Sequence, residues 1–135
     1  MLVRSYRDLR VWQISIDFAE DLYRITLLFP REEVYSLTAQ IRRAVSSIPL
    51  NIAEGHARSS TREFLHSLSI AAGSLAEVET QLILAARLNY LEQARLDELL
   101  LKSDEIGKMI RGLRKSLQAR INPGASEPRS LAPSP

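Results

Sequence analysis

The stretch that decides the fold runs from Gln40 to Arg62 and reads QIRRAVSSIPLNIAEGHARSSTR. Its apolar residues recur at steps of three and four, the spacing that places side chains on one face of an α-helix. Near its end, Ser60 followed by Glu63 forms the capping box that begins a further helix. The stretch therefore predicts two helices joined by a short turn.

The same spacing extends over most of the chain. It predicts helices over about residues 8–28, 32–57, 60–89 and 92–120. The composition agrees, because 45% of the residues are apolar, only 6% are aromatic and five are glycine. Long helices with short connections predict an all-α fold, an antiparallel up-down-up-down four-helix bundle over residues 1–120. Residues 121–135 are rich in Pro and Ser without a period, which predicts a disordered tail.

Apolar residues also occur at helix positions outside the stripe that a four-helix bundle buries in its core. Two apolar lines recur along the first predicted helix, one with Trp12, Ile16, Ala19, Tyr23 and Thr26, the other with Val11, Phe18, Leu22, Ile25 and Phe29. Such a face is wider than a surface helix needs. On later helices, the positions opposite the core stripe include Leu50, Ile70, Leu84 and Leu88. Together these residues predict a second buried surface, which we interpret as the interface of a homo-oligomer.

Polar side chains follow one edge of the core stripe in the second predicted helix. They are Gln40, Ser47, Asn51, Glu54 and Arg58, and Glu79 falls on the apolar face of the third predicted helix. Groups at such a boundary lose part of their water and need hydrogen-bond partners. We interpret Gln40, Ser47, Asn51, Glu54 and Glu79 as a structural polar ladder, with Glu79 in a buried ion pair. The alternative role for Glu79 is a catalytic or metal-binding carboxylate.

Pro49 lies inside the second predicted helix. It lacks a backbone donor and its ring pushes against the carbonyl of Val45, so it predicts a kink. Ser46 and Ser47 come just before it, and their hydroxyls can bond the carbonyls that the kink frees. We interpret this proline as a structural feature of the helix rather than as part of an active site.

Little in the sequence indicates catalysis. The chain has no Cys, which excludes disulfides, thiol catalysis and thiolate metal sites, and its glycines are isolated, so no phosphate-binding loop is present. Glu63 and His66 have the Glu-x-x-His spacing of helical di-metal sites, but such sites need a second pair and two further carboxylates. We therefore expect a protein that is not an enzyme and that has no metal and no cofactor.

The sequence also bears on where the protein works. The segment MLVRSYRDLR lacks the apolar run that follows the charges of a secretory signal. No stretch approaches the roughly 20 uncharged apolar residues of a membrane span. Together with the absence of Cys, these features predict a cytoplasmic protein that does not enter a membrane.

Arginines are the best candidates for contact with a ligand. The net charge of +2 and the pI of about 9.2 permit nucleic-acid binding without requiring it. Arg42 and Arg43 lie outside the core stripe, and Arg58 and Arg62 flank the turn between the second and third predicted helices. Repeated around an oligomer, they would form a basic surface for the phosphates of RNA or DNA. The alternative is a solvated face whose arginines pair with neighbouring glutamates.

The chain resembles the bacterial four-helix-bundle proteins encoded in intervening sequences of 23S ribosomal RNA genes. The resemblance extends from about Tyr6 to Leu117 and is carried by FPREEVYSLTAQIRRAVSSIPLNIAEGHAR and EFLHSLSIAAGSLAEVETQLILA. The matching motif residues are Leu37, Thr38, Gln40, Arg43, Ala44, Ser47, Ile48, Pro49, Asn51, Ile52, Ala53, Glu54 and Gly55. The resemblance implies a closed homo-oligomer, a pentamer, and a relation to accessory proteins of diversity-generating retroelements. Those proteins assist a reverse transcriptase and bind nucleic acid.

Two functional hypotheses follow from the residues and the resemblance. The first is a homo-oligomeric bundle that binds RNA or DNA without sequence preference through its arginines. The alternative is a protein-interaction adaptor, for example an accessory subunit of a reverse transcriptase, with no nucleic-acid activity of its own.

Overall fold

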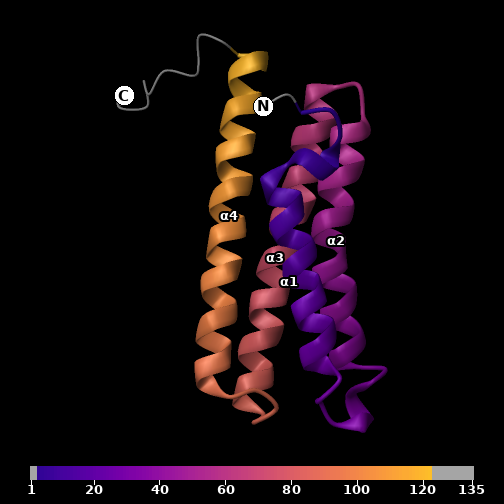
Figure 1. The fold of residues 1–135 in the computed structure, drawn as a ribbon, viewed down its shortest axis with the longest axis vertical. Helices are drawn as coiled ribbons and strands as arrows, with labels where there is room; N and C mark the ends of the chain where they lie inside the picture. The colour runs from indigo at the N-terminus through magenta and orange to yellow at the C-terminus, as the bar shows by residue number, and fades with distance from the viewer. Residues whose placement is uncertain (1–2, 123–135) are drawn as a thin grey trace, which may run out of the picture.

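The computed structural model describes residues 3–122 and confirms the predicted all-α bundle (Figure 1). Its elements in order are the 3₁₀ turn η1 (Tyr6–Asp8), α1 (Arg10–Thr26), the 3₁₀ turn η2 (Arg31–Glu33), α2 (Leu37–Ala57), α3 (Thr61–Arg87) and α4 (Gln93–Ile121). Successive α-helices run in opposite directions, as Figure 1 shows. Helix α4 includes Ile121, one residue beyond the predicted boundary, and residues 123–135 of the predicted tail lie outside the described part.

Local signals set the ends of α3 as the sequence predicted. Ser60 is its N-cap, and the Ser60 hydroxyl accepts a hydrogen bond from the backbone N–H of Glu63 at 3.2 Å. Beyond its other end, Asn89 adopts the left-handed conformation, with φ of 66°. The residues at its two ends, Ser60 and Asn89, therefore account for where α3 begins and ends.

The start of α2 differs from the prediction. Residues 31–33 form the turn η2, and α2 begins only at Leu37, because Ser36 has φ of −125° and ψ of −106°, outside the helical region. The carboxylate of Glu33 accepts a hydrogen bond from the backbone N–H of Leu37 at 3.2 Å. Glu33 therefore stabilises the N-terminus of α2 from outside the helix, where its charge also complements the helix dipole.

The core runs along the axis of the bundle and consists mainly of branched aliphatic side chains. Its fully buried members are Phe18 and Leu22 of α1, Ile41, Val45, Ile48 and Ile52 of α2, Leu68, Val78 and Leu82 of α3, and Leu99, Ile106 and Ile110 of α4. Each such side chain contributes about 1.5–3 kcal/mol to the free energy of folding through burial.

Of the two apolar lines on α1, the one with Phe18 and Leu22 faces this core. The other is only partly covered, with Ile16 39% and Tyr23 42% exposed.

Two residues of the opening stretch control the course of α2. The helix continues through Pro49, while the Ser46 hydroxyl donates to the carbonyl of Arg43 at 3.2 Å. Near its C-terminus, a Cβ added to Gly55 would lie 2.6 Å from the Cβ of Ser67 on α3. No side chain fits at that distance, so only glycine permits the close approach of α2 and α3 beside their connecting turn.

Helix α3 also has the length and hydropathy of a membrane span, the only described helix that does. Its apolar residues include Leu68, Leu75 and Leu82, which are buried in the bundle. Between them, half-buried Glu79 hydrogen-bonds α4. This distribution is that of a core helix that packs on two neighbours.

Candidate nucleic-acid interface

The polar ladder between α2 and α3 is centred on Ser47. The hydroxyls of Ser47 and Ser74 are 2.9 Å apart, and the side-chain amide of Asn51 donates to the Ser47 carbonyl at 2.8 Å and to its hydroxyl at 2.9 Å. These half-buried groups satisfy one another, which indicates a structural role. Gln40, predicted to join them, is exposed and makes no side-chain hydrogen bond within residues 3–122.

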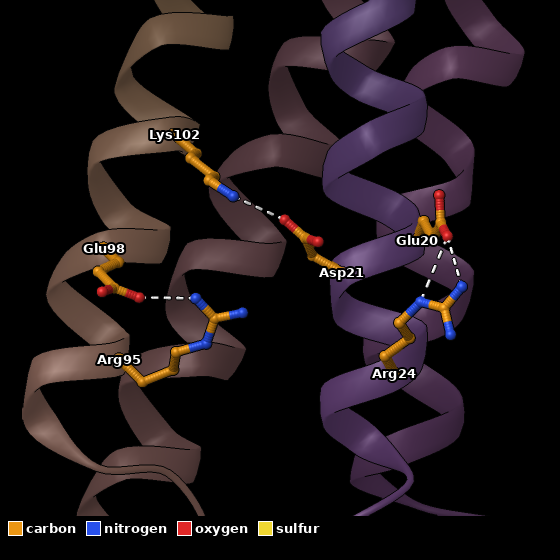
Figure 2. Close-up of polar contacts among 6 residues, drawn as sticks. All are labelled: Glu20, Asp21, Arg24, Arg95, Glu98 and Lys102. Carbon is orange, nitrogen blue, oxygen red and sulfur yellow. Dashed lines mark hydrogen bonds and ion pairs between the residues drawn. The ribbon is translucent and has the colours of Figure 1, made fainter.

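Glu79 has a hydroxyl partner in place of the expected ion pair. The buried Ser103 of α4 donates its hydroxyl to the Glu79 carboxylate, and no cation of residues 3–122 pairs with it. The neighbouring Lys102 points instead toward α1, where it pairs with Asp21 at 2.8 Å (Figure 2). Because consecutive helical residues diverge by about 100°, only one of Ser103 and Lys102 can face α3.

Arg42 forms hydrogen bonds with the C-terminal end of α1. Its Nε donates to the Thr26 hydroxyl at 2.9 Å and its Nη2 donates to the Tyr23 carbonyl at 3.0 Å. The guanidinium also lies 4.8 Å from the centre of the Tyr23 ring. A cation that satisfies the last carbonyls of a helix is a C-terminal cap. Arg42 thus ties α2 to α1, although its sequence position alone suggested a free surface arginine.

The other three predicted arginines are exposed but lie apart. Arg58 pairs with Glu54 at 3.2 Å and approaches Glu63 at 3.8 Å, so part of its charge is offset. Arg62 lies in the first turn of α3 and has no ion pair within residues 3–122. Arg43 is exposed fifteen residues before Arg58, a rise of about 22 Å along the helix. The structure therefore brings Arg58 and Arg62 together at the α2–α3 turn and leaves Arg43 in the second turn of α2, nearer the opposite end of the bundle.

Cations that the sequence interpretation missed gather at the same end of the bundle. The α2–α3 turn, the start of α1 and the last turns of α4 lie together there, at the top of Figure 1. We call this the basic end. Its cations are Arg4, Arg7, Arg10, Arg58, Arg62, Arg111, Arg114, Lys115 and Arg120, and its carboxylates are Asp8, Glu54 and Glu63. The signal was visible in the sequence, because residues 106–122 contain no Asp or Glu.

The opposite end of the bundle is close to neutral. Its carboxylates are Glu20, Asp21, Glu32, Glu33, Glu92, Asp97 and Glu98, and its cations are Arg24, Arg31, Arg42, Arg87, Arg95 and Lys102. Several cations there are neutralised by ion pairs (Figure 2): Arg24 with Glu20 at 2.6 Å, Arg95 with Glu98 at 2.6 Å and Lys102 with Asp21 at 2.8 Å. The hydrogen bond to Glu20 raises the pKa of Arg24. A net charge of only +2 thus conceals a concentration of positive charge at the basic end.

Two hollows open on the surface of the basic end, and Arg62 and His66 line both. One, of about 420 Å³, follows the α2–α3 seam and includes Glu54 and Glu63. The other, of about 330 Å³, follows the α3–α4 seam; we call it the seam hollow. Its described lining is Arg62, Leu65, His66, Ser69, Arg114, Gln118, Ile121 and Asn122, without any carboxylate. Within residues 3–122 no three His, Asp or Glu side chains gather as metal ligands.

The residues predicted for an oligomer interface are exposed on two faces. Leu50 is 65% exposed and lines an apolar groove of about 330 Å³ between α1 and α2. The groove is lined by Tyr6, Trp12, Ile16, Ala19, Ser46, Pro49, Leu50 and Ala53. Ile70, Leu84 and Leu88 are exposed on α3, and their spacings of fourteen and four place them on one face. Trp12, Ile16 and Ala19, from the apolar line of α1 that is only partly covered, form one wall of this groove.

The fold and its charged end define a small antiparallel four-helix bundle with a basic pole. The sequence model of the 23S rRNA-intervening sequence proteins matches residues 7–112, so the chain belongs to that family. This confirms the resemblance noted from the motif residues.

Among solved structures, the chain is similar to a protein of unknown function from the S23 ribosomal protein family of Bacteroides thetaiotaomicron. The two share 27% sequence identity with a TM-score of 0.72, and the match covers 78% of this chain and 95% of that one. None of the curated proteins matches the chain.

Proposed function

We propose that the protein is a non-enzymatic, homo-oligomeric helical bundle that binds RNA or DNA through its basic end. The observation that carries the proposal is the concentration of cations at the basic end, where Arg111 and Lys115 lie in the part of α4, residues 106–121, that has no carboxylate. Phosphates of a nucleic acid are the repeated anions that suit such a surface. Contacts to phosphates carry little sequence information, so the preference among sequences is slight.

Self-association supports the same function. The exposed groove around Leu50 and the outer face of α3 offer apolar surface that a second copy can cover. A closed ring, a pentamer in the form that the resemblance implies, repeats the basic end in every subunit. The combined field is then much larger than the +2 of one chain suggests.

Binding of a labelled single-stranded and a duplex oligonucleotide over a series of salt concentrations tests the proposal. Affinity should fall linearly with the logarithm of salt concentration, with a slope that counts the phosphates neutralised. Lys115→Gln and Arg111→Gln should weaken binding equally for unrelated sequences. Arg31→Gln is the matched control, because it removes the same charge beyond the opposite end of the bundle. Salt-independent binding, or equal loss in all three variants, contradicts the proposal.

A protein-interaction adaptor is the second candidate function, and the apolar groove favours it. Trp12, Pro49 and Leu50 present ring and aliphatic surface of the kind that protein partners bury. A partner such as a reverse transcriptase would then co-purify with the chain. Leu50→Asp would release it, whereas Lys115→Gln and Arg111→Gln would not.

A further inference from the structure

The seam hollow combines four long polar side chains on two antiparallel helices. Arg62 and His66 are one turn apart on α3, and Arg114 and Gln118 are one turn apart on α4. Because α3 and α4 run in opposite directions, the two pairs face each other across the seam at the same height. Two guanidinium groups and an imidazole thus enter one hollow from opposite walls.

One buried donor of Arg114 has no hydrogen-bond partner. Its Nε is buried and makes no hydrogen bond within residues 3–122. A buried N–H without an acceptor is costly, and a cation makes the cost larger. No carboxylate lines the hollow. Arg114 also lines a neighbouring hollow on the same seam with Glu79 and Asp104, but it forms no ion pair with either carboxylate within residues 3–122. An anionic ligand would provide both the missing acceptor and the missing charge.

We propose that the seam hollow binds one phosphate group together with the sugar attached to it, that is, a single nucleotide unit. Donors converge from two walls, which suits the tetrahedral oxygens of phosphate better than the planar pair of a carboxylate. The volume of about 330 Å³ exceeds what a bare phosphate fills and lies in the range of pockets for small organic ligands. Leu65 and Ile121 provide apolar lining for the sugar.

The adjoining hollow on the α2–α3 seam does not share this property. It contains the same Arg62 and His66, but Glu54 and Glu63 also line it. Arg58 pairs with Glu54 and approaches Glu63, so part of its charge is offset. The nucleotide site therefore belongs to the α3–α4 seam, where Arg114 takes the place of the glutamates.

The phosphate could come from a bound nucleic acid or from a free nucleotide, and only the first source rests on the proposed function. Isothermal titration calorimetry with inorganic phosphate, adenosine monophosphate and a short oligonucleotide distinguishes these two sources of the phosphate. We expect adenosine monophosphate to bind more tightly than inorganic phosphate, since the sugar adds contacts. Arg62→Gln and Arg114→Gln should each weaken adenosine monophosphate binding about tenfold or more, the usual effect of losing a charged hydrogen bond.

Arg87→Gln is the matched control, because Arg87 is an exposed arginine at the other end of α3 and does not line the hollow. Its binding of adenosine monophosphate should stay within about twofold of the unmodified protein. Thermal unfolding verifies that each variant is folded. If Arg114→Gln does not fold, Arg62→Gln decides, since Arg62 is exposed and makes no ion pair within residues 3–122.

The outcomes distinguish the two proposals. If the unmodified protein binds no adenosine monophosphate, or if Arg87→Gln loses as much affinity as Arg62→Gln, the nucleotide site is refuted. Salt-dependent oligonucleotide binding would still support the proposed function in that case. If adenosine monophosphate binding depends on Arg62 and Arg114 but no oligonucleotide binds, the proposed function fails. The seam hollow would then be a binding site for a free nucleotide.

Discussion

Replacing Gly55 by alanine should destabilise the bundle, whereas the same change at Gly73 should stabilise it. At Gly55 the new methyl carbon would lie 2.6 Å from the Cβ of Ser67 and 2.8 Å from Cδ1 of Phe64. Unstrained carbons sit about 3.5–4.0 Å apart, so α2 and α3 must separate by roughly 1 Å. Because the Ser67 Cβ is fixed to its backbone, it cannot move aside as the end of a flexible side chain would.

The expected size follows from two opposing terms. Overpacking of a filled interface costs about 1–3 kcal/mol, and a clash with a Cβ belongs near the upper limit. Alanine returns about 1 kcal/mol through its higher helix propensity. Gly55→Ala should therefore lose about 2 kcal/mol, or about 5–10 °C in Tm for a chain of this size. At Gly73 nothing lies within 4 Å of the added carbon, so only the gain of about 1 kcal/mol remains.

Thermal and urea unfolding, followed by circular dichroism, measure both variants under identical conditions and protein concentration. An unchanged urea slope would show that the shift reflects stability rather than a different unfolded state. A Tm of Gly55→Ala at or above that of the unmodified protein would refute the close approach of α2 and α3. Equal losses at Gly55 and Gly73 would refute it too, because the steric difference between the sites would then have no effect.

Three further predictions use other parts of the bundle. Arg42→Gln should cost about 1–3 kcal/mol in urea unfolding, since it removes the charged hydrogen bond to Thr26 and the cap on α1; no loss would contradict this capping role. A hydrogen bond to the Glu33 carboxylate at 2.8 Å raises the pKa of Tyr90, so its stabilisation should persist below the unfolded value of about 10 and disappear as pH rises further. Tyr90→Phe should flatten that alkaline loss of Tm, and an unchanged profile would argue against the bond. Light scattering should give an oligomer whose mass falls toward 15.2 kDa in Leu50→Asp; a monomeric unmodified protein would refute self-association.

The sequence predicted those features that depend on neighbours along the chain. Apolar spacing identified the buried positions Ile41, Ile48 and Ile52, and short-range chemistry identified Ser60 and Asn89 at the ends of α3. These signals act within a turn or two of helix, so one sequence carries them fully. The helix count and the antiparallel order followed from them with no tertiary information.

Features that depend on partners across the bundle were predicted less well. Helical position placed Arg42 correctly outside the core, but only the structure shows that it reaches the last carbonyls of α1. Glu79 was recognised as needing a partner, yet which residue of α4 faces it depends on the rotation of that helix. The first helix had two apolar lines, and the periodicity alone could not predict which line would be buried. Ile16 and Tyr23 in fact stay partly exposed.

The arrangement of surfaces would link the proposed assembly to the proposed ligand binding. The apolar groove and the outer face of α3 lie along the sides of the bundle, whereas the basic end lies at one pole of its long axis. Copies related by a rotation axis parallel to the helices meet through their sides and place every basic end on one face of the ring. Cyclic closure therefore adds basic ends without burying them. For this geometry, loss of the ring in Leu50→Asp should weaken oligonucleotide binding while leaving the adenosine monophosphate site of each subunit intact.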